Sequence, residues 1–336
     1  MYSMTKSDLR IVFMGTPEFA VETLKALVKN EYNVVAVVTQ PDKPVGRHGS
    51  VLQPSAVKQY ALEKGLPVLQ PEKMKDPAFI ETLRSYEANL QVVVAFRMLP
   101  EVVWAMPAYG TFNVHAALLP QYRGAAPINW AIINGETETG VTTFFLDHDI
   151  DTGRIIMQLP FPIPDDADVE YVYNGLMHLG AKICLQTLEK IMEADGHPDS
   201  MAQSDSSLFT LHSSLHSAPK IFKETCQIDW TKTAKQVYDF ARGLSPYPGV
   251  WTNLVDAEGH STVLKIFKTT KTTLPSQGET GQIIVEKKHL YVACADTLLQ
   301  IDELQLAGKK RMDAQAFMNG MKSLESYRVQ YQSDIV

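Results

Sequence analysis

Residues 9–39 read LRIVFMGTPEFAVETLKALVKNEYNVVAVVT, and this stretch decides the fold. Its apolar, β-branched run at 9–14 stops at a Gly-Thr-Pro sequence, which predicts a buried strand followed by a turn. Thr16 is expected to cap a helix that carries Pro17 at its first position. A second buried strand is predicted at 33–39. A strand, a helix and a strand within about 30 residues form a βαβ unit, and this unit predicts a parallel sheet.

The chain up to residue 194 continues this alternation of apolar strands and periodic helices. Strands are predicted at 67–69, 90–95, 110–114, 141–146 and 155–159, and helices at 54–64, 77–86, 127–134 and 168–194. We therefore expect an α/β domain with a Rossmann-like, mostly parallel sheet. The polar segment at 40–52 is too long for a simple connection, so a functional loop is predicted there. The turn at Gly15 lacks the later glycines of a dinucleotide fingerprint, and no P-loop lysine motif occurs, so an NAD or ATP site is not supported.

The sequence pattern changes after this domain. Residues 195–220 are rich in Asp, Ser, His and Pro without periodicity, which predicts a linker. Beyond it, a helix is expected at 231–243, and short strands are expected at 249–255, 262–268, 281–285, 289–293 and 298–306. Strands of this length and spacing predict a small antiparallel barrel or sandwich. We place a catalytic domain at 1–198, the linker at 199–219 and a C-terminal domain at 220–336.

Charge is unevenly distributed along the chain. Of its 336 residues, 45% are hydrophobic and 21% are charged, and the formal net charge is −7. Residues 1–217 hold 16 Lys and Arg against 25 Asp and Glu, a net of −9, whereas residues 218–336 hold 15 against 13, a net of +2. The relatively basic second part weakly indicates contact with a polyanion. From charge alone, an ordinary solvated surface is the favoured explanation.

The cysteines and the lengths of the apolar runs bear on where in the cell the protein is expected. Cys184, Cys226 and Cys294 are far apart and form no CxxC pair, so reduced thiols are expected rather than a disulfide framework. No apolar stretch approaches the ~18 residues of a spanning helix, and the first residues lack an apolar signal core. A cytoplasmic protein without a membrane segment is therefore expected.

Two polar side chains stand out at the end of a predicted strand. Asn113 and His115 point to the same side of an alternating strand, at the edge where open α/β sheets bind ligands. An amide and an imidazole on one side can donate two hydrogen bonds to a developing oxyanion. A purely structural role for both side chains is an equal alternative at this point.

Three acids follow at the end of a later strand. Asp147, Asp149 and Asp151 lie close to one another in sequence, but alternation aims them in different directions and no His or Cys ligand pair accompanies them. No metal site is therefore expected. Asp151, just before Thr-Gly, is suited to orienting a His or managing a proton, whereas Asp147 and Asp149 are interpreted as turn residues.

A resemblance to a known family rests on motifs that occur in order. They are GTPEFA at 15–20, TQPDKPVGR at 39–47, NVHAALLPQYRGAAPI at 113–128 and IDTG at 150–153. With them, the chain resembles the methionyl-tRNA formyltransferase family from about residue 9 to residue 330. The resemblance implies transfer of a formyl group from 10-formyltetrahydrofolate to the α-amine of methionine on initiator tRNA. It also implies a C-terminal OB-like β-barrel domain that contacts tRNA, and we expect a monomer.

The resemblance assigns roles to particular residues. It implies that Asn113 and His115 stabilise the tetrahedral oxyanion and that Asp151 keeps His115 in the correct protonation state and helps move protons. Folate binding is assigned to the strand and loop matching 94–99 and to the segment 146–151. The individual folate-binding residues are Val94, Ala95, Phe96, Arg97, Leu99, Leu118, Leu119, Pro120 and Asp149. The tRNA-binding residues are Lys43, Arg47 and Arg123.

Three positions depart from the family pattern. Ala117 replaces a usual Ser, Arg97 replaces a common Gly, and residues 48–51 lack the usual extra Lys or Arg. The nearest alternative function is a folate-dependent formyltransferase that acts on a small amine such as an amino sugar. A nucleic-acid-binding protein with an inactive α/β domain is disfavoured by the intact Asn-His-Asp set. A dinucleotide-dependent oxidoreductase is disfavoured by the missing glycines.

Overall fold

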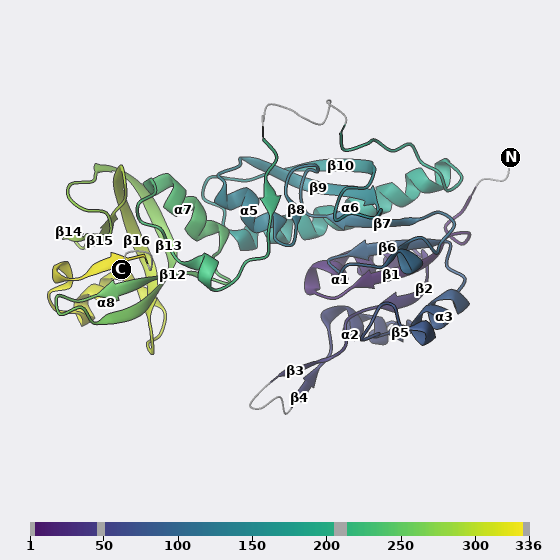
Figure 1. Ribbon diagram of the computed structural model, residues 1–336, viewed down its shortest axis with the longest axis horizontal. Coiled ribbons are helices and arrows are strands. Elements are labelled where there is room, and N and C mark those ends of the chain that lie inside the picture. The colour runs from purple at the N-terminus through teal and green to yellow at the C-terminus, as the bar shows by residue number, and fades with distance from the viewer. Residues whose placement is uncertain (1–3, 46–50, 205–213, 332–336) are drawn as a thin grey trace. The chain divides into compact units, whose positions relative to one another are not determined.

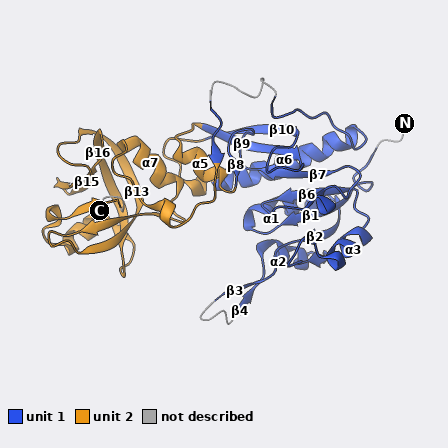
Figure 2. Cartoon of the chain, viewed as in Figure 1, with its two compact units in different colours: residues 1–124, 138–162, 173–217 blue, residues 125–137, 163–172, 218–336 orange. Residues whose placement is uncertain are grey.

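The computed structural model describes residues 4–45, 51–204 and 214–331. The chain divides into two compact units, shown in different colours in Figure 2. Unit 1 comprises residues 1–124, 138–162 and 173–217, and unit 2 comprises residues 125–137, 163–172 and 218–336. Both units are therefore built from more than one segment of the chain. The predicted domain boundaries at 198 and 220 stay a prediction.

Unit 1 is built on a mixed sheet (Figure 1). Its strands, in spatial order, are β10 (Ile155–Pro162), β9 (Glu138–Phe145), β7 (Thr111–His115), β6 (Leu90–Val94), β1 (Arg10–Gly15), β2 (Asn33–Val38) and β5 (Val68–Leu69). The pairings from β5 to β7 are parallel, and those of β9 with β7 and β10 are antiparallel. The predicted Rossmann-like, mostly parallel sheet is confirmed.

The turn after β1 differs in one detail from the prediction. Helix α1 (Glu18–Lys29) begins after Pro17, which takes the N-cap position predicted for Thr16. The Thr16 hydroxyl instead accepts a hydrogen bond from the Gln40 N–H at 3.4 Å, so it ties the end of β1 to the end of β2. Gly15 is required by close packing, because a Cβ there would lie 2.7 Å from the Ala20 Cβ.

The remaining helices include two that the sequence pattern did not predict, α4 and α8. The helices after α1 are α2 (Ala56–Glu63), α3 (Pro77–Ser85), α4 (Glu101–Trp104), α5 (Pro127–Ile133), α6 (Val169–Glu193), α7 (Ala234–Gly243) and α8 (Ala314–Gly320). Short 3-10 turns lie at Glu224–Cys226 and Leu324–Ser326, and two-residue strands β8 and β11 at Arg123–Gly124 and Ser217–Ala218.

The segment predicted as a loop at 40–52 contains a hairpin. Strands β3 (Lys43–Val45) and β4 (Val51–Gln53) pair in antiparallel fashion, and they project away from the sheet of unit 1 (Figure 1). Residues 46–50 between them lie outside the described part of the chain. The functional role predicted for this loop stays a prediction, and its two flanks pair as strands.

Unit 2 contains an antiparallel sheet that curls on itself. Its strands, in spatial order, are β14 (Ile283–Glu286), β15 (His289–Ala293), β16 (Thr297–Leu306), β13 (Ser261–Pro275), β12 (Val250–Val255) and β18 (Arg328–Gln330), and β17 (Met312–Asp313) pairs with β16. The two edges approach each other, since Gln282 bridges to Arg328 and the Val329 N–H donates to the Gly281 carbonyl at 2.9 Å. This closure agrees with the predicted barrel-like C-terminal architecture.

The cores of the two units are apolar and hold the cysteines as free thiols. In unit 2, helix α7 buries Val237 and Tyr238 against the curled sheet. Cys184, Cys226 and Cys294 are all buried and unpaired with one another, as their spacing predicted. Burial raises the pKa of the Cys294 thiol to about 12.

Within the described ranges, the helices are all too short or too polar to cross a bilayer.

Candidate active site

Strand β7 places Asn113 and His115 on one side of the sheet of unit 1. Asn113 pairs in register with Val93 of β6 and with Phe144 of β9, and His115 pairs with Thr142. Asn113 is partly buried, and no described residue hydrogen-bonds its buried Oδ1 atom. Because buried polar atoms are nearly always paired in folded proteins, this amide is suited to receiving a ligand. Rotation of the amide would present its NH2 donor at the same place.

The two ring nitrogens of His115 face different groups. Its side chain is 6% exposed, and Nε2 lies 2.9 Å from the carbonyl oxygen of Tyr122. A carbonyl can only accept a hydrogen bond, so Nε2 carries the proton. The other nitrogen, Nδ1, lies 3.9 Å from Oδ2 of Asp151. The Asp151 carboxylate therefore faces Nδ1 at a separation longer than a direct hydrogen bond.

Asp151 is fixed by an unusual backbone conformation. Its φ is 55°, in the left-handed region that few residues other than glycine adopt. The carboxylate is 13% exposed, and Oδ2 accepts a 2.9 Å hydrogen bond from the Gly124 N–H. Two residues later, a Cβ on Gly153 would lie 1.6 Å from the Phe145 carbonyl oxygen, so only glycine fits there. The IDTG sequence therefore forms a tight turn that aims Asp151 at His115.

The segments predicted to bind folate begin at the end of β6. Val94 ends that strand and Ala95 has a φ of 47°, so the chain turns sharply there. The Arg97 guanidinium donates to the carbonyls of Pro71 and Glu72, and burial lowers the pKa of this group. The residue that replaces the family glycine is thus tied to a neighbouring loop.

The second predicted folate segment is organised by Asp147. Its Oδ1 accepts from the Asp149 N–H at 3.2 Å and from the Thr152 hydroxyl at 2.7 Å. Asp147 is therefore a turn-forming residue, as interpreted from the sequence, whereas the Asp149 side chain is exposed. Folate binding by Asp149 and by the residues at 94–99 stays a prediction.

The loop after β7 shows how the chain accommodates Ala117. Ala117 is fully buried, and its carbonyl accepts a 2.6 Å hydrogen bond from the Thr142 hydroxyl. The same hydroxyl accepts from the Leu119 N–H at 3.1 Å, and Leu119 and Pro120 are buried. Hydrogen bonding in this loop therefore uses a hydroxyl from β9. Leu118, Leu119 and Pro120 keep their predicted folate roles as predictions.

The predicted tRNA-binding residues lie in different parts of unit 1. Lys43 is exposed on β3, and Arg47 lies outside the described residues. The Arg123 guanidinium donates through Nε and Nη2 to Oε1 of Gln203, at 3.0 and 2.7 Å. Gln203 was not predicted, since it lies in a polar segment that resembles a linker and its partners are distant in sequence. The tRNA-binding role of these three residues stays a prediction.

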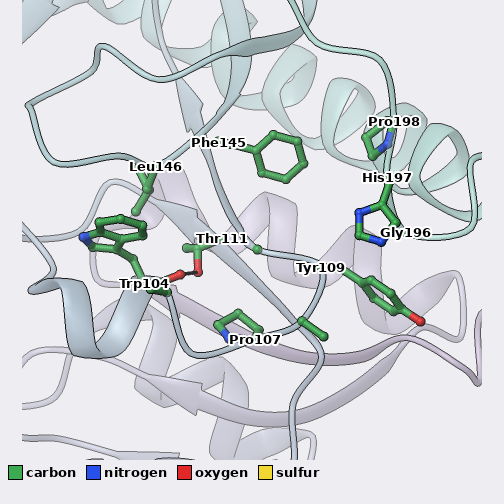
Figure 3. Close-up of a pocket in the computed structure, with 12 residues that line it drawn as sticks. Trp104, Pro107, Tyr109, Thr111, Phe145, Leu146, Gly196, His197 and Pro198 are labelled. Atoms are coloured by element: carbon green, nitrogen blue, oxygen red, sulfur yellow. Dashed lines mark hydrogen bonds between the residues drawn. The ribbon is translucent and has the colours of Figure 1, made fainter.

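A separate cavity of about 360 Å³ opens in unit 1 (Figure 3). Trp104 and Leu146 stand on one side of it in Figure 3, and Tyr109 and His197 on the other. It reaches Thr111, the first residue of β7, whereas His115 ends that strand. Apart from Leu146, its lining includes none of the residues in the predicted folate segments. Nowhere in the described ranges do three or more His, Cys, Asp or Glu side chains gather so as to hold a metal ion.

Comparison with known sequences places the chain in a family. The family model described as formyl transferase matches residues 9–188, and the model described as formyl transferase, C-terminal domain, matches residues 220–322. Together these segments cover most of the chain. The chain therefore belongs to the formyl transferase family.

Individual relatives are more specific. The chain is 58% identical to a methionyl-tRNA formyltransferase of Parabacteroides distasonis, over 97% of this chain and 100% of the relative. It is 54% identical to a methionyl-tRNA formyltransferase of Bacteroides thetaiotaomicron, over the same shares of the two chains.

Solved structures share the fold at low sequence identity. HypX from Aquifex aeolicus, in complex with tetrahydrofolic acid, has a TM-score of 0.60 at 17% identity and covers 94% of this chain and 48% of that one. An N-formyltransferase from Helicobacter canadensis has a TM-score of 0.61 at 19% identity and covers 90% of this chain and 100% of that one. At these identities the likeness supports the fold alone.

Proposed function

We propose that this protein transfers a formyl group from 10-formyltetrahydrofolate to the α-amino group of methionyl initiator tRNA, for translation initiation. The observation that carries the chemistry is the buried pair of His115 and Asp151 beside Asn113, whose Oδ1 has no partner among the described residues. The family defines formyl transfer, and relatives of nearly full length named methionyl-tRNA formyltransferase support the acceptor.

The residues of the site fit this reaction. 10-Formyltetrahydrofolate supplies the formyl carbon, and attack by the methionyl amine places negative charge on the formyl oxygen while a proton leaves the amine. The amide of Asn113 and the imidazole of His115 stabilise that oxygen, because fixed hydrogen-bonding groups in a buried site need little reorganisation. The Asp151 carboxylate orients the imidazole and helps move the amine proton. This proton finally reaches the folate nitrogen that loses the formyl group.

The proposal also places the two substrates, the folate and the tRNA, on the protein. The folate lies along the residues at 94–99 and 118–120 and beside Asp149, next to the Asn113 amide. The acceptor end of the tRNA meets the hairpin with Lys43 and Arg47, together with Arg123. The C-terminal unit, which carries a net charge of +2 over residues 218–336, adds contacts to the phosphate backbone. The protein acts in the cytoplasm, as a monomer and without a metal ion.

A substrate panel tests this function. The protein is incubated with 10-formyltetrahydrofolate and, in separate reactions, with methionyl initiator tRNA, uncharged tRNA or a nucleotide-linked amino sugar. Formyl incorporation is followed by mass spectrometry of the hydrolysed products. We expect N-formylmethionine from the charged tRNA and no formylated product from the other acceptors. Formylation of the amino sugar without formylation of methionine would show that the alternative function is correct.

A further inference from the structure

A buried glutamine lies next to the turn that presents Asp151. Gln203 is 5% exposed and belongs to unit 1. It follows Met201, which forms an isolated antiparallel bridge with Ile155, with backbone hydrogen bonds of 2.7 and 2.8 Å. Its position falls between the two segments, 9–188 and 220–322, that match the family models. The polar segment predicted as a linker thus delivers a side chain to the site.

The two ends of the Gln203 amide have different partners. Its oxygen accepts from Nε and Nη2 of Arg123, at 3.0 and 2.7 Å. Its nitrogen donates to the carbonyls of Asp151 and Gly153, both at 2.8 Å. Arg123 can only donate and a carbonyl can only accept, so chemistry fixes the orientation of the amide. Among uncharged side chains, only Gln and the shorter Asn supply both an acceptor oxygen and an NH2 group with two protons.

These bonds close a ring around the acid. Gln203 holds the backbone carbonyls on either side of Thr152, and Arg123 holds Gln203. Gly124, the neighbour of Arg123, donates to the Asp151 carboxylate at 2.9 Å. The left-handed conformation of Asp151 is sparsely populated in free chains, so it persists only where its surroundings hold it. The ring supplies that restraint and sets the carboxylate 3.9 Å from Nδ1 of His115.

We propose that Gln203 is a positioning residue for formyl transfer, which acts by holding the Asp151 turn so that its carboxylate faces His115. The expected effect of Gln203 on the rate of formyl transfer rests on the proposed function. It also assigns Arg123 a second task, that of anchoring Gln203. A misplaced catalytic group slows chemistry, and Gln203→Glu keeps the acceptor for Arg123, so this variant leaves the proposed tRNA contact of Arg123 in place.

Gln203→Glu tests this role with little change in shape. The carboxylate still accepts from Arg123, but its second oxygen faces two carbonyls and cannot donate. We expect kcat to fall about tenfold, with KM for both substrates within about twofold of the wild type. Gln203→Met, which is uncharged but also releases Arg123, is expected to lower kcat to the same extent. The matched control is Gln315→Glu at an exposed position on α8, which should keep the wild-type kcat, and thermal melting followed by circular dichroism checks that each variant is folded.

A double-mutant cycle separates positioning from general destabilisation. If Gln203 acts through Asp151, then Gln203→Glu lowers kcat by less than about twofold in an Asp151→Asn background. If kcat of the double variant falls by the product of the two single-variant losses, the proposal is wrong. A wild-type kcat in both Gln203 variants would also overturn it.

Hydrogen exchange provides a readout that needs no substrate. The Gly124 amide donates to the Asp151 carboxylate, so its exchange should be about tenfold faster in folded Gln203→Glu than in the wild type. Unchanged exchange would refute the positioning role even if the wild type transfers no formyl group. Failure of the wild type to formylate methionyl-tRNA would instead refute the proposed function and leave the exchange result to decide the role of Gln203.

Discussion

Replacing Asp151 by Asn removes one charge from the site and little else. The two side chains are close in size, and the Asn side-chain oxygen can still accept from the Gly124 N–H, so the turn should keep its fold. What disappears is the attraction, across 3.9 Å, between the carboxylate and a His115 ring that carries a proton on both nitrogens during the reaction. At this separation, unit charges attract by about 1 kcal/mol in water and about 4 kcal/mol at an effective dielectric constant of about 20.

The burial of the pair determines which limit applies. The side chains of His115 and Asp151 are 6% and 13% exposed, so the attraction falls in the upper half of that range, at about 3 kcal/mol. A charged imidazole that is needed in the transition state loses this amount in Asp151→Asn, which corresponds to about a 10²-fold lower kcat. KM for the two substrates should change little, since the amide keeps the shape of the site.

The assay is single-turnover formyl transfer to methionyl-tRNA with saturating 10-formyltetrahydrofolate. Asp199→Asn, at an exposed position outside the site, serves as the charge control and should retain the wild-type rate. Thermal melting of both variants verifies that they are folded. A folded Asp151→Asn protein with the wild-type rate would refute the electrostatic role of Asp151.

Three further predictions concern the Asn113 amide, the Asp151 turn and the hairpin segment that carries Arg47. Asn113→Ala removes one hydrogen-bonding group from the oxyanion and should lower kcat about 10²-fold without changing the melting temperature; a rate within twofold of the wild type would contradict this role. Gly153→Ala forces a Cβ against the Phe145 carbonyl and should lower the free energy of unfolding by about 2–3 kcal/mol, measured by urea denaturation; equal stability would show that the turn relaxes freely. Arg47→Ala should raise KM for tRNA and reduce the slope of log affinity against log salt by about one, whereas an unchanged slope would exclude a phosphate contact.

Much of the fold was predictable because its signals are local. The apolar runs that form β1, β2 and β6 are buried on both sides of a parallel sheet, and such strands show up as continuous hydrophobic stretches. Short elements such as α4, with four residues, have too few turns to produce a periodic pattern. Thr16 was assigned to a cap from its residue type, and only the structure shows that its hydroxyl faces Gln40.

The site was predictable in part for a similar reason. Asn113 and His115 share one strand, so alternation alone places them on one side of it. Their approach to Asp151 depends on the turn that Gly153 permits, which the IDTG motif indicated only through family resemblance. Gln203 was missed because its partner Asp151 is 52 residues away in the sequence, and residues that meet only after folding leave no local pattern.

The Asp147 turn shows the opposite case. The Asp147 carboxylate accepts from the backbone N–H of Asp149, two residues later. Such a bond is local, so the interpretation of Asp147 as a turn residue needed no tertiary information. The aromatic cavity beside Trp104 and Tyr109 had no such signal, because its walls come from three separate segments of the chain.

Asn113, His115 and Asp151 are proposed to carry out formyl transfer to methionyl-tRNA. The most direct measurement compares the wild type with His115→Ala in single-turnover transfer of a labelled formyl group from 10-formyltetrahydrofolate to methionyl initiator tRNA. We predict N-formylmethionyl-tRNA as the wild-type product. For the folded variant we predict a rate that is lower by at least about 10²-fold. Absence of formylated methionine with the wild type, or equal rates for the two proteins, would contradict the account.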